Sequence, residues 1–511
     1  MKGRSRIAST ACLALLLCHA AIAAPATPPP ADADWAEIGR LAAAVQQADG
    51  TDAALPFERP SAAALAAAPR QVFALYFPFF LTSMDNAPPA RDHWAQHYMK
   101  RAGEGGKYAS AGGFTRERPL PAGPWPGPYW RETAEAVDVL RARAIGLDAF
   151  GVGLQEPGSG HTFNISLGVC QAAAHLVPGF HVFGEPDAAV LRDIPAETMV
   201  RTIATYETCP AALRTAEGHG LVAPFAPNNE PVSYWADVLA RLKADGARLD
   251  FIPVLLDPGR FAEGFGPLSQ AMSFWGQRDT FSMANPGWRA ALARIKATAP
   301  DWMQPVTPQD FRPNAQIFWE ARNTEMFRAS WMEAIQGHAR YAHVITWNDY
   351  SEGTELAPSS GTQFLFYDLA AYYIAWFKTG TPPRITRDAI YYSHRTQIFS
   401  PDAPPQPGDL PFRRLGETPL ANDIEMLAML TAPAEIEIEI AGRRVAQAAP
   451  AGLTALRAPA AAGRPHFRIL RAGAPVVEKT SDWEIAATPE AASGMYFGGS
   501  STRRFVPLPA E

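Results

Sequence analysis

The sequence predicts an α/β protein, a (β/α)8 TIM barrel followed by a C-terminal domain that resembles a β-sandwich. Eight short β-like runs alternate with helical stretches in the middle of the chain. This alternation indicates a parallel sheet, and eight repeats favour closure into a barrel. After Gly380 the helical stretches give way to alternating strands. An open doubly wound sheet is the alternative, but no dinucleotide-binding glycine fingerprint follows the first strand.

The chain begins with a segment typical of a secretory signal peptide. Lys2, Arg4 and Arg6 precede an apolar stretch at residues 11–17, and Ala21-Ile22-Ala23 resembles a cleavage signal. We therefore predict that residues 1–24 are removed and that the protein is secreted or periplasmic. A membrane anchor would need about 20 apolar residues, and no later segment has that character.

The rest of the chain divides into three predicted parts. Residues 25–69 form a linker and helical segment, residues 70–384 the barrel, and residues 385–511 a β-rich domain. The predicted barrel strands cover residues 71–77, 148–154, 181–184, 221–226, 250–256, 271–275, 303–306 and 343–347.

Amphipathic helices are predicted at residues 233–244, 325–336 and 364–378. In the first, Ser233 can cap the helix, and apolar residues recur at i, i+3, i+4 and i+7. The last is closed by Gly380 and two prolines. Beyond it, residues 390–398 and the strictly alternating residues 435–440 are predicted strands.

Charge and cysteine content limit the partners. The formal net charge of the 511 residues is −6, with no basic run, which argues against nucleic acid or an anionic membrane as the partner.

Cys12 and Cys18 leave with the signal, so Cys170 and Cys209 are the disulfide candidates, with two buried thiols as the alternative. We expect a monomer with no cofactor and no metal.

Acidic residues recur where predicted barrel strands begin or end, and a barrel builds its active site at the C-terminal ends of its strands. Aromatic residues lie near the same positions. Carboxylates among aromatic rings are typical of a sugar site, because rings stack on pyranoses and acids handle hydroxyls and glycosidic bonds. The acidic and amide positions are Asp148, Glu185, Asp187, Asn229, Glu230, Asp257, Asp310, Asp349 and Glu352, and the aromatic ones are Trp275, Trp319, Trp347 and Tyr350.

Asp349 and Glu352 follow the last predicted strand and are three residues apart. Glycoside hydrolysis needs one protonated acid and a second carboxylate that attacks the sugar or activates water. Two neighbouring carboxylates help one of them to stay protonated. Structural alternatives exist. Asp349 in an Asn-Asp turn can cap the next helix, and Asp148 and Asp257 can be N-caps or hydrogen-bond acceptors at strand ends. Trp275 and Trp347 can belong to the barrel core.

The stretch Trp347-Asn348-Asp349-Tyr350-Ser351-Glu352 resembles the Trp-Asn-Asp-Tyr-Gly-Glu hallmark of glycoside hydrolase family 71, the α-1,3-glucanases. Further segments resemble that family in the same order, among them residues 146–150, 180–187, 325–331 and 391–395. The resemblance implies a metal-independent inverting mechanism on a barrel with an appended β-domain. It also implies that Asp349 and Glu352 are catalytic and that Asp148 and Asp187 line the sugar cleft.

From these patterns we predict a secreted glycoside hydrolase that cleaves α-1,3-glucan or a related extracellular polysaccharide. Glu352 is the preferred acid, because glutamate has the longer reach and the higher reference pKa. The predicted substrate-binding residues are Asp148, Asp187, Asp257, Trp275, Trp347, Asn348, Tyr350 and Tyr76.

Departures from the family pattern place the linkage specificity in question. Ser351 replaces the usual glycine, Leu75 stands where a histidine is common, and an insertion at residues 84–127 would cover the barrel mouth. The alternatives are an endo-mannosidase-like hydrolase, which the run Tyr76-Phe77-Pro78-Phe79 allows, and a non-catalytic glycan-binding protein on the same fold.

Overall fold

The structure of the chain is a computed structural model that describes residues 33–158, 160–402 and 407–509. The predicted signal segment, residues 1–24, lies outside the described residues, together with Cys12 and Cys18.

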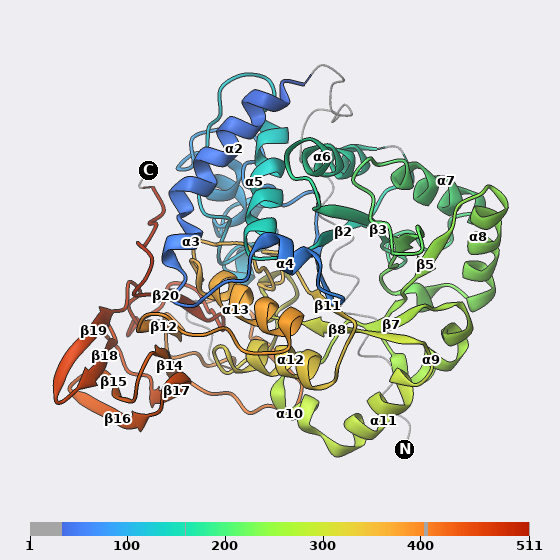
Figure 1. Cartoon of the computed structure of the whole chain (residues 1–511). Coiled ribbons are helices and arrows are strands. Elements are labelled where there is room, and N and C mark those ends of the chain that lie inside the picture. The colour runs from blue at the N-terminus through green and yellow to red at the C-terminus, as the bar shows by residue number, and fades with distance from the viewer. Residues whose placement is uncertain (1–32, 159, 403–406, 510–511) are drawn as a thin grey trace.

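A parallel sheet forms the centre of the molecule (Figure 1), and its strands fall close to the predicted runs. The strand order is β5-β4-β3-β2-β1-β11-β8-β7-β6. The two ends of this order, β5 and β6, are separated in the chain only by Ile252 and Pro253, and Phe225 bridges to Val254 across the gap. The sheet therefore curls round on itself and fits a TIM-like barrel. The bounds are β1 (Gln71–Tyr76), β2 (Ala149–Leu154), β3 (His181–Pro186), β4 (Gly220–Val222), β5 (Leu249–Phe251), β6 (Val254–Leu255), β7 (Ala271–Phe274), β8 (Asp301–Val306) and β11 (Tyr341–Val344).

Pro253 accounts for the division between β5 and β6. The sequence predicted one strand over residues 250–256, but proline has no N–H and cannot donate to the ladder. The carbonyl of Pro253 still accepts a hydrogen bond from the Ser273 N–H at 3.1 Å, so this segment keeps its place beside β7.

Helices surround the strands on the outside (Figure 1). The helix predicted at 233–244 begins one residue earlier, after Pro231, and no side chain caps it, so the prediction that Ser233 caps it is wrong. The helix before the C-terminal region ends at Gly380 in the left-handed conformation, φ 81°, as expected of a glycine C-cap. The bounds are α5 (Trp130–Ala144), α6 (His161–Leu176), α7 (Ala196–Glu207), α8 (Val232–Ala244), α9 (Pro258–Phe265), α10 (Thr280–Ala284), α11 (Pro286–Lys296), α12 (Glu325–Gln336) and α13 (Leu365–Thr379).

The N-terminal helices α2 (Trp35–Asp49), α3 (Thr51–Ala54) and α4 (Ala62–Ala66) lie against this helical layer. Arg141 of α5 binds Asp49 of α2 through its Nε, at 2.8 Å, and both side chains are buried. The ring of Trp35 stacks on that of His175 in α6, with 4.7 Å between centroids. The segment predicted as linker and helical thus adds helices to the barrel exterior.

Side chains alternate between the barrel interior and the helix layer, as the two-residue period of a strand requires. On β1, Phe73 belongs to a core enclosed by the strands, whereas Val72, Ala74 and Tyr76 belong to the larger core beneath the helices. The enclosed core consists mainly of Phe73, Ala149, Phe183, Leu221, Ala223, Phe225, Ile252, Val254, Ala271, Met303 and Tyr341.

Two four-stranded antiparallel sheets form the C-terminal region, consistent with the predicted sandwich-like domain. The alternating residues 435–440 lie in β15, where Ile436, Ile438 and Ile440 enter the core between the sheets. One sheet has the order β17 (Gly452–Pro459), β14 (Asp423–Leu430), β12 (Ala389–His394), β20 (Phe497–Ser500). The other has the order β16 (Arg443–Ala449), β15 (Ala434–Ile440), β18 (His466–Arg471), β19 (Ala474–Thr480).

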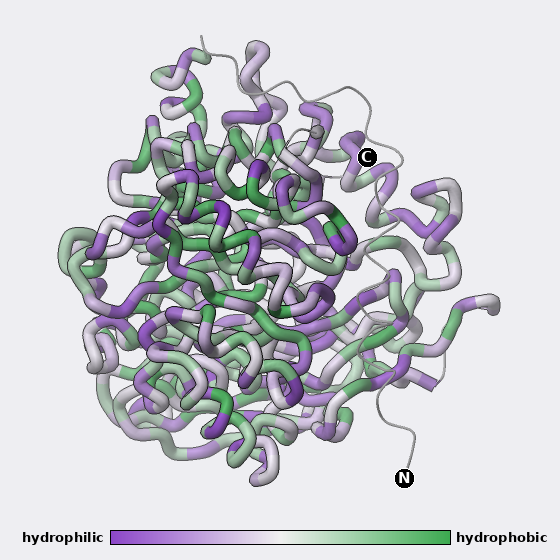
Figure 2. The backbone as a smooth tube through the Cα atoms, turned by 90° about the vertical axis from the view of Figure 1, so that its right-hand side faces the viewer, coloured by the Kyte–Doolittle hydropathy of each residue, from purple (hydrophilic) through white to green (hydrophobic). Residues whose placement is uncertain are grey.

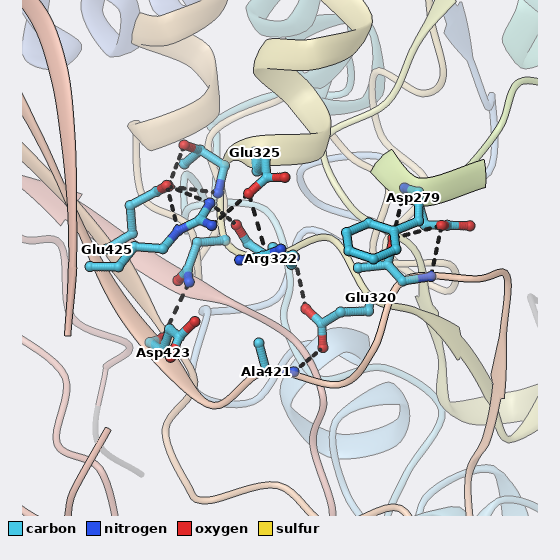
Figure 3. A network of polar contacts seen from close by, with 12 residues as sticks. Asp279, Glu320, Arg322, Glu325, Ala421, Asp423 and Glu425 are labelled. Carbon is cyan, nitrogen blue, oxygen red and sulfur yellow. Dashed lines mark hydrogen bonds and ion pairs between the residues drawn. The ribbon is translucent and has the colours of Figure 1, made fainter. Parts of the chain in front are cut away.

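A buried polar network joins the C-terminal region to the barrel (Figure 3). Glu425 of β14 accepts hydrogen bonds from the Thr324 N–H at 2.9 Å and from Arg328 at 2.9 Å, at the start of α12. Glu320 accepts from Arg395 at 2.8 Å and from the Tyr496 hydroxyl at 2.6 Å. Buried carboxylates need such partners to offset the cost of desolvation, so this junction is firmly connected.

A second connection between the two regions is the three-stranded sheet β13-β10-β9. It pairs β9 (Phe311–Arg312) and β10 (Ile317–Trp319), from the loop after β8, with β13 (Arg413–Leu415). The loop that carries Arg312 is therefore supported from the C-terminal side.

The two candidate cysteines form a disulfide bond. Cys170 lies in α6 and Cys209 follows α7, and their Cα atoms are 6.0 Å apart. The bond ties together two neighbouring helices of the outer layer.

Hydrophobic and hydrophilic residues are interspersed along the chain (Figure 2). Among the described residues, no helix has both the length and the apolar character needed to cross a membrane.

Candidate active site

A pocket lies where the barrel strands end, and residues from most of the barrel contribute to it. We call it the carboxylate pocket. Its lining residues are Leu75, Phe77, Gly153, Glu185, Asp187, Phe225, Trp275, Arg312 and Glu352. Parallel strands deliver their C-terminal ends to one face of a barrel, which is why residues so far apart in sequence meet here. Of the predicted site residues, the pocket brings together Glu352, Asp187 and Trp275.

Glu352 is a buried carboxyl with one oxygen paired and the other without a protein partner. Its Oε1 lies 2.6 Å from Nη1 of Arg312, while Oε2 makes no hydrogen bond to any residue that the structure describes. The pKa of Glu352 is raised to about 8, chiefly by burial; Arg312 acts to lower it, and the neighbouring carboxylates of Asp349 and Asp310 act to raise it. A carboxyl with this pKa holds its proton at neutral pH and can donate it.

Asp349 holds the turn that carries Glu352. Its Oδ1 accepts hydrogen bonds from the N–H groups of Ser351 at 2.9 Å and Glu352 at 3.0 Å, and from the Ser351 hydroxyl at 2.7 Å. Burial raises the pKa of Asp349, although these bonds and Arg312 act in the opposite direction. Asp349 is not among the residues that line the carboxylate pocket. Asp349 therefore stabilises a turn next to the pocket with one oxygen and does not cap a helix, because the next helix, α13, begins only at Leu365.

Arg312 is a pocket residue that the sequence did not reveal. Its Nε and Nη2 bind the two oxygens of Asp310, each at 2.7 Å, while Nη1 binds Glu352. Asp310 thus fixes the guanidinium plane, and a bidentate pair of this kind is both strong and directional. Arg278 adds a second cation, with its Nε 3.5 Å from Asp310 and its guanidinium 5.0 Å from the Trp275 ring centroid. Nothing in the local sequence distinguishes either arginine from a surface one.

Glu185 is a second pocket carboxylate, which the sequence placed after the third strand but did not select. Its Oε2 lies 3.3 Å from Nε2 of His343, with both side chains fully buried. The inward-facing Gly151 leaves the room it needs, because a Cβ there would stand 2.3 Å from that oxygen. Glycines at alternate, inward positions of a buried strand were the signal that a neighbouring side chain enters the barrel.

Asp187 follows β3, and its carboxylate accepts hydrogen bonds from nearby loops. Oδ1 accepts from the N–H groups of Ala189 at 3.0 Å and Val190 at 3.2 Å, and Oδ2 accepts from Gln155 at 3.0 Å. Burial raises the pKa of Asp187 to about 6. The residue is placed to meet a ligand hydroxyl while it holds its own turn.

A second hollow, the aromatic cleft, adjoins the carboxylate pocket. Ser351 lines it beside Glu352 of the pocket, and Pro78 lines it beside Phe77. Its walls include aromatic rings that can stack on sugars. The lining residues are Pro78, Phe79, Phe80, Leu81, Met84, Tyr98, Phe114, Arg131, Glu156, His161, Thr162, Ile165, Asn314 and Ser351.

Asp148 is not in the cleft, which corrects the prediction. It precedes β2 and therefore lies at the N-terminal end of the strand, opposite the carboxylate pocket. Its Oδ1 binds Nζ of Lys378 at 2.6 Å, and its Oδ2 accepts from the Val72 N–H at 2.7 Å. Asp148 thus links the N-terminal end of the barrel strands to α13.

Tyr76 and Trp347 are also corrected, because both side chains pack in the core beneath the helices and do not line the pocket. The Tyr76 hydroxyl donates to Asp138 of α5 at 3.3 Å. The rings of Tyr76 and Trp347 both pack on Phe150, with centroids 4.9 and 5.3 Å away. Both are fully buried in the core beneath the helices.

Three further predicted residues make structural contacts or lie outside both hollows. Asn348 is buried, accepting from the Phe77 N–H at 2.8 Å and donating to the Phe77 and Phe80 carbonyls. Tyr350 is buried against Trp94, with 5.1 Å between ring centroids. Asp257 is exposed at the start of α9, so it is an N-terminal residue of that helix and lines neither hollow.

Residues 128–496, well over half of the chain, match the model of glycosyl hydrolase family 71. No curated protein matches the sequence.

Solved structures with similar folds include the GH99 endo-α-mannosidase from Bacteroides thetaiotaomicron, 15% identical, covering 60% of this chain and 98% of that one, with a TM-score of 0.47. Another is β-glucuronidase 2 of Bacteroides uniformis, 9% identical, covering 72% of this chain and 45% of that one, with a TM-score of 0.40. At these scores the likenesses carry no argument.

Proposed function

Because the chain belongs to glycosyl hydrolase family 71, we propose that it is an exported hydrolase of α-1,3-glucan or a related extracellular polysaccharide. The proposed catalytic pair is Asp349 and Glu352, and the mechanism inverts the anomeric carbon. One observation carries the proposal: Glu352 stands in a pocket at the C-terminal ends of the barrel strands, with a pKa raised to about 8 and an oxygen without a partner.

Glu352 is the proposed acid. A carboxyl of this pKa is about nine-tenths protonated at pH 7. When the glycosidic bond breaks, the leaving oxygen gains negative charge and takes the proton of Glu352. The carboxylate that remains is then stabilised by Arg312, whose position Asp310 fixes.

Asp349 is the proposed base. In an inverting reaction a carboxylate accepts a proton from water as the water attacks the sugar from the face opposite the leaving group. The three hydrogen bonds to Oδ1 keep that oxygen in place and favour the charged form.

The aromatic cleft is the proposed binding site for the rest of the polysaccharide. Phe79, Phe80 and Phe114 contribute apolar surface beside the carboxylate pocket, and Trp275 contributes a ring within it. Pyranose rings present apolar faces that such surfaces bury, while their hydroxyls meet the polar residues of the rim. The enzyme is expected to act as a monomer.

The test is product analysis on a panel of α-1,3-, α-1,4- and β-1,3-glucans and α-mannan. The proposal predicts new reducing ends from α-1,3-glucan and, by proton NMR at early times, the β-anomer as the first product. Cleavage of α-mannan alone would favour the endo-mannosidase alternative. Binding without any release of reducing ends would favour a glycan-binding protein.

The pair is tested by three substitutions measured on the active substrate. Asp349→Asn and Glu352→Gln are expected to lower kcat by about 10²-fold or more, the scale of acid–base catalysis. Glu185→Gln is the matched comparison, since Glu185 also lines the pocket. If Glu185→Gln abolishes turnover while Asp349→Asn leaves it intact, the second carboxylate is Glu185.

A further inference from the structure

The insertion, residues 84–127, precedes the part of the chain that matches the family model. It contains a π-helical turn, η2 (Trp94–Tyr98), and a short 3-10 turn, η3 (Glu104–Gly106). π-helical turns are rare and occur frequently at functional sites. This turn places His93 and His97 four residues apart, so their side chains meet on one side of it.

The two histidines and Glu104 form a compact group of possible metal ligands. The ligand atoms of the three residues all lie within 4.8 Å of one another. Oε1 of Glu104 is 3.5 Å from Nε2 of His93 and 3.8 Å from Nδ1 of His97. The imidazole rings stack, with 4.5 Å between centroids.

These separations can be compared with the geometry of zinc sites. Zn²⁺ binds histidine nitrogen and carboxylate oxygen at about 2.0–2.2 Å in a tetrahedral arrangement, so two of its ligand atoms stand roughly 3.4 Å apart. The His93–Glu104 distance is close to this value, and the His97–Glu104 distance exceeds it by a few tenths of an ångström. A small rotation of the exposed His97 side chain is enough to close that difference.

The polar atoms of His93 and Glu104 do not satisfy each other by hydrogen bonding, which indicates a place for a ligand. Nε2 of His93 is buried and makes no hydrogen bond to any described residue, although buried nitrogens in proteins nearly always have a partner. Oε1 of Glu104 stands beyond good hydrogen-bond distance from it, at 3.5 Å. A metal ion between them would satisfy both groups.

The surrounding structure holds His93 in position for this role. The backbone N–H of His93 donates to Oδ2 of Asp85 at 2.9 Å. The His93 ring meets that of Tyr98 edge-on, with 4.6 Å between centroids. His97 is more open, with 52% of its side chain exposed. An ion can therefore enter from solvent past His97 and meet a histidine whose position is already set.

We propose that His93, His97 and Glu104 form a binding site for a divalent transition metal of the zinc class, with water completing the coordination. Imidazole nitrogens with one carboxylate suit Zn²⁺ better than Mg²⁺ or Ca²⁺, which prefer oxygen ligands. The site is distinct from the carboxylate pocket, and the hydrolytic residues do not take part in it.

The site would stabilise the wall of the aromatic cleft. Tyr98 lines the cleft and adjoins His97, and its carbonyl accepts from the N–H of Phe114, another cleft residue, at 2.9 Å. A bound ion would link the π-helical turn to the turn that carries Glu104, and so hold these two aromatic residues in place. The role is structural, on the part of the chain that the family model does not cover.

The test is titration of the tag-free, metal-stripped full chain with Zn²⁺ by isothermal calorimetry. We expect one ion per chain, and an affinity at least about 10-fold lower in His97→Ala and in Glu104→Gln, because loss of a ligand costs at least as much as loss of a residue that supports one. His219→Ala is the matched control, because His219 also pairs with a carboxylate, Asp250, at 2.8 Å but belongs to no three-ligand group among the described residues. It should bind Zn²⁺ like the wild type.

Two results would overturn the site: no Zn²⁺ binding by the wild type, or equal binding by wild type, His97→Ala and Glu104→Gln. The visible absorption of bound Co²⁺ provides a second readout, which reports the ligands of the ion directly and does not depend on the stability of the variants. The wild type should develop the visible absorption of low-coordinate Co²⁺ with nitrogen ligands, and Glu104→Gln, a near-isosteric change, should lose it. A Co²⁺ spectrum like that of the hexaaquo ion would also contradict the proposal.

Discussion

Replacing Glu352 by glutamine should inactivate the enzyme and stabilise the fold, and the gain in stability should depend on pH. Glutamine keeps the shape of the acid and remains neutral. Arg312 loses one partner in the variant but keeps its two bonds to Asp310. The substitution removes the free-energy cost of ionising a buried carboxyl group.

The magnitude follows from the pKa. The pKa of Glu352 is raised from its ordinary value of 4.5 to about 8 in the folded protein, chiefly by burial. Because the folded pKa is raised, the stability associated with the protonated group is full below pH 4.5 and is lost as the pH rises to about 8. At 1.36 kcal/mol per pKa unit, the wild type loses about 1 kcal/mol by pH 5 and about 5 kcal/mol by pH 9.

Urea unfolding of wild type and Glu352→Gln at pH 5 and pH 9 measures this difference. The variant should be more stable by about 1 kcal/mol at pH 5 and about 5 kcal/mol at pH 9. The control is Glu263→Gln, an exposed residue of α9, which should change stability by less than about 0.5 kcal/mol at both values. An advantage of the same size at both pH values would refute the argument that Glu352 is a buried, protonated acid.

Four further predictions follow from the same contacts. The value of kcat/KM should fall about tenfold per pH unit above pH 8, as Glu352 loses its proton; an alkaline limb that begins only above pH 10 would contradict this. Lys378→Met should lower the unfolding free energy by about 3–5 kcal/mol, because it leaves buried Asp148 unpaired, without altering KM; a large rise in KM would return Asp148 to the cleft. Gly151→Ala should destabilise the protein by about 1–3 kcal/mol, because its Cβ would lie 2.3 Å from Glu185, whereas Gly153→Ala meets its nearest atom at 3.5 Å and should have a smaller effect; equal losses would count against this view of the barrel interior. Opening the Cys170–Cys209 bond by a double serine substitution should lower the unfolding free energy by about 4 kcal/mol, since the bond closes a separation of 39 residues; a loss below 1 kcal/mol in urea unfolding would contradict it.

The barrel strands could be predicted because their evidence is local. Each is a short apolar run bounded by turn residues, and the alternation with helices already implies parallel pairing. Pro253 divides the fifth strand because proline has no N–H to donate to the ladder, an effect that the apolar run at residues 250–256 does not reflect. The network around Glu425 and Glu320 (Figure 3) could not be foreseen, because its members come from distant parts of the chain.

The candidate site was predicted only in part. Glu352 was recognisable because its whole motif lies in one turn, whereas Arg312 and Glu185 depend on which strands lie opposite each other. Asp148 was misplaced because it precedes its strand. A six-residue strand is about 20 Å long, so a residue before it and one after it lie at opposite ends of the barrel. Tyr76 was misassigned because its strand turns it toward the helices, and Trp347, which lies beyond the end of β11, packs into the same core.

Hydrolysis of an α-glycosyl fluoride tests most directly the central claim, that Glu352 supplies the proton and Asp349 activates the water. Fluoride leaves without needing a proton, so the acid is dispensable on this substrate and the base is not. We predict that Glu352→Gln hydrolyses the fluoride of the active sugar at a rate near that of the wild type, while its rate on the oligosaccharide falls by about 10²-fold or more. Asp349→Asn should be impaired on both substrates. If Glu352→Gln is equally inactive on fluoride and oligosaccharide, Glu352 is not the acid, and the account of this site is wrong.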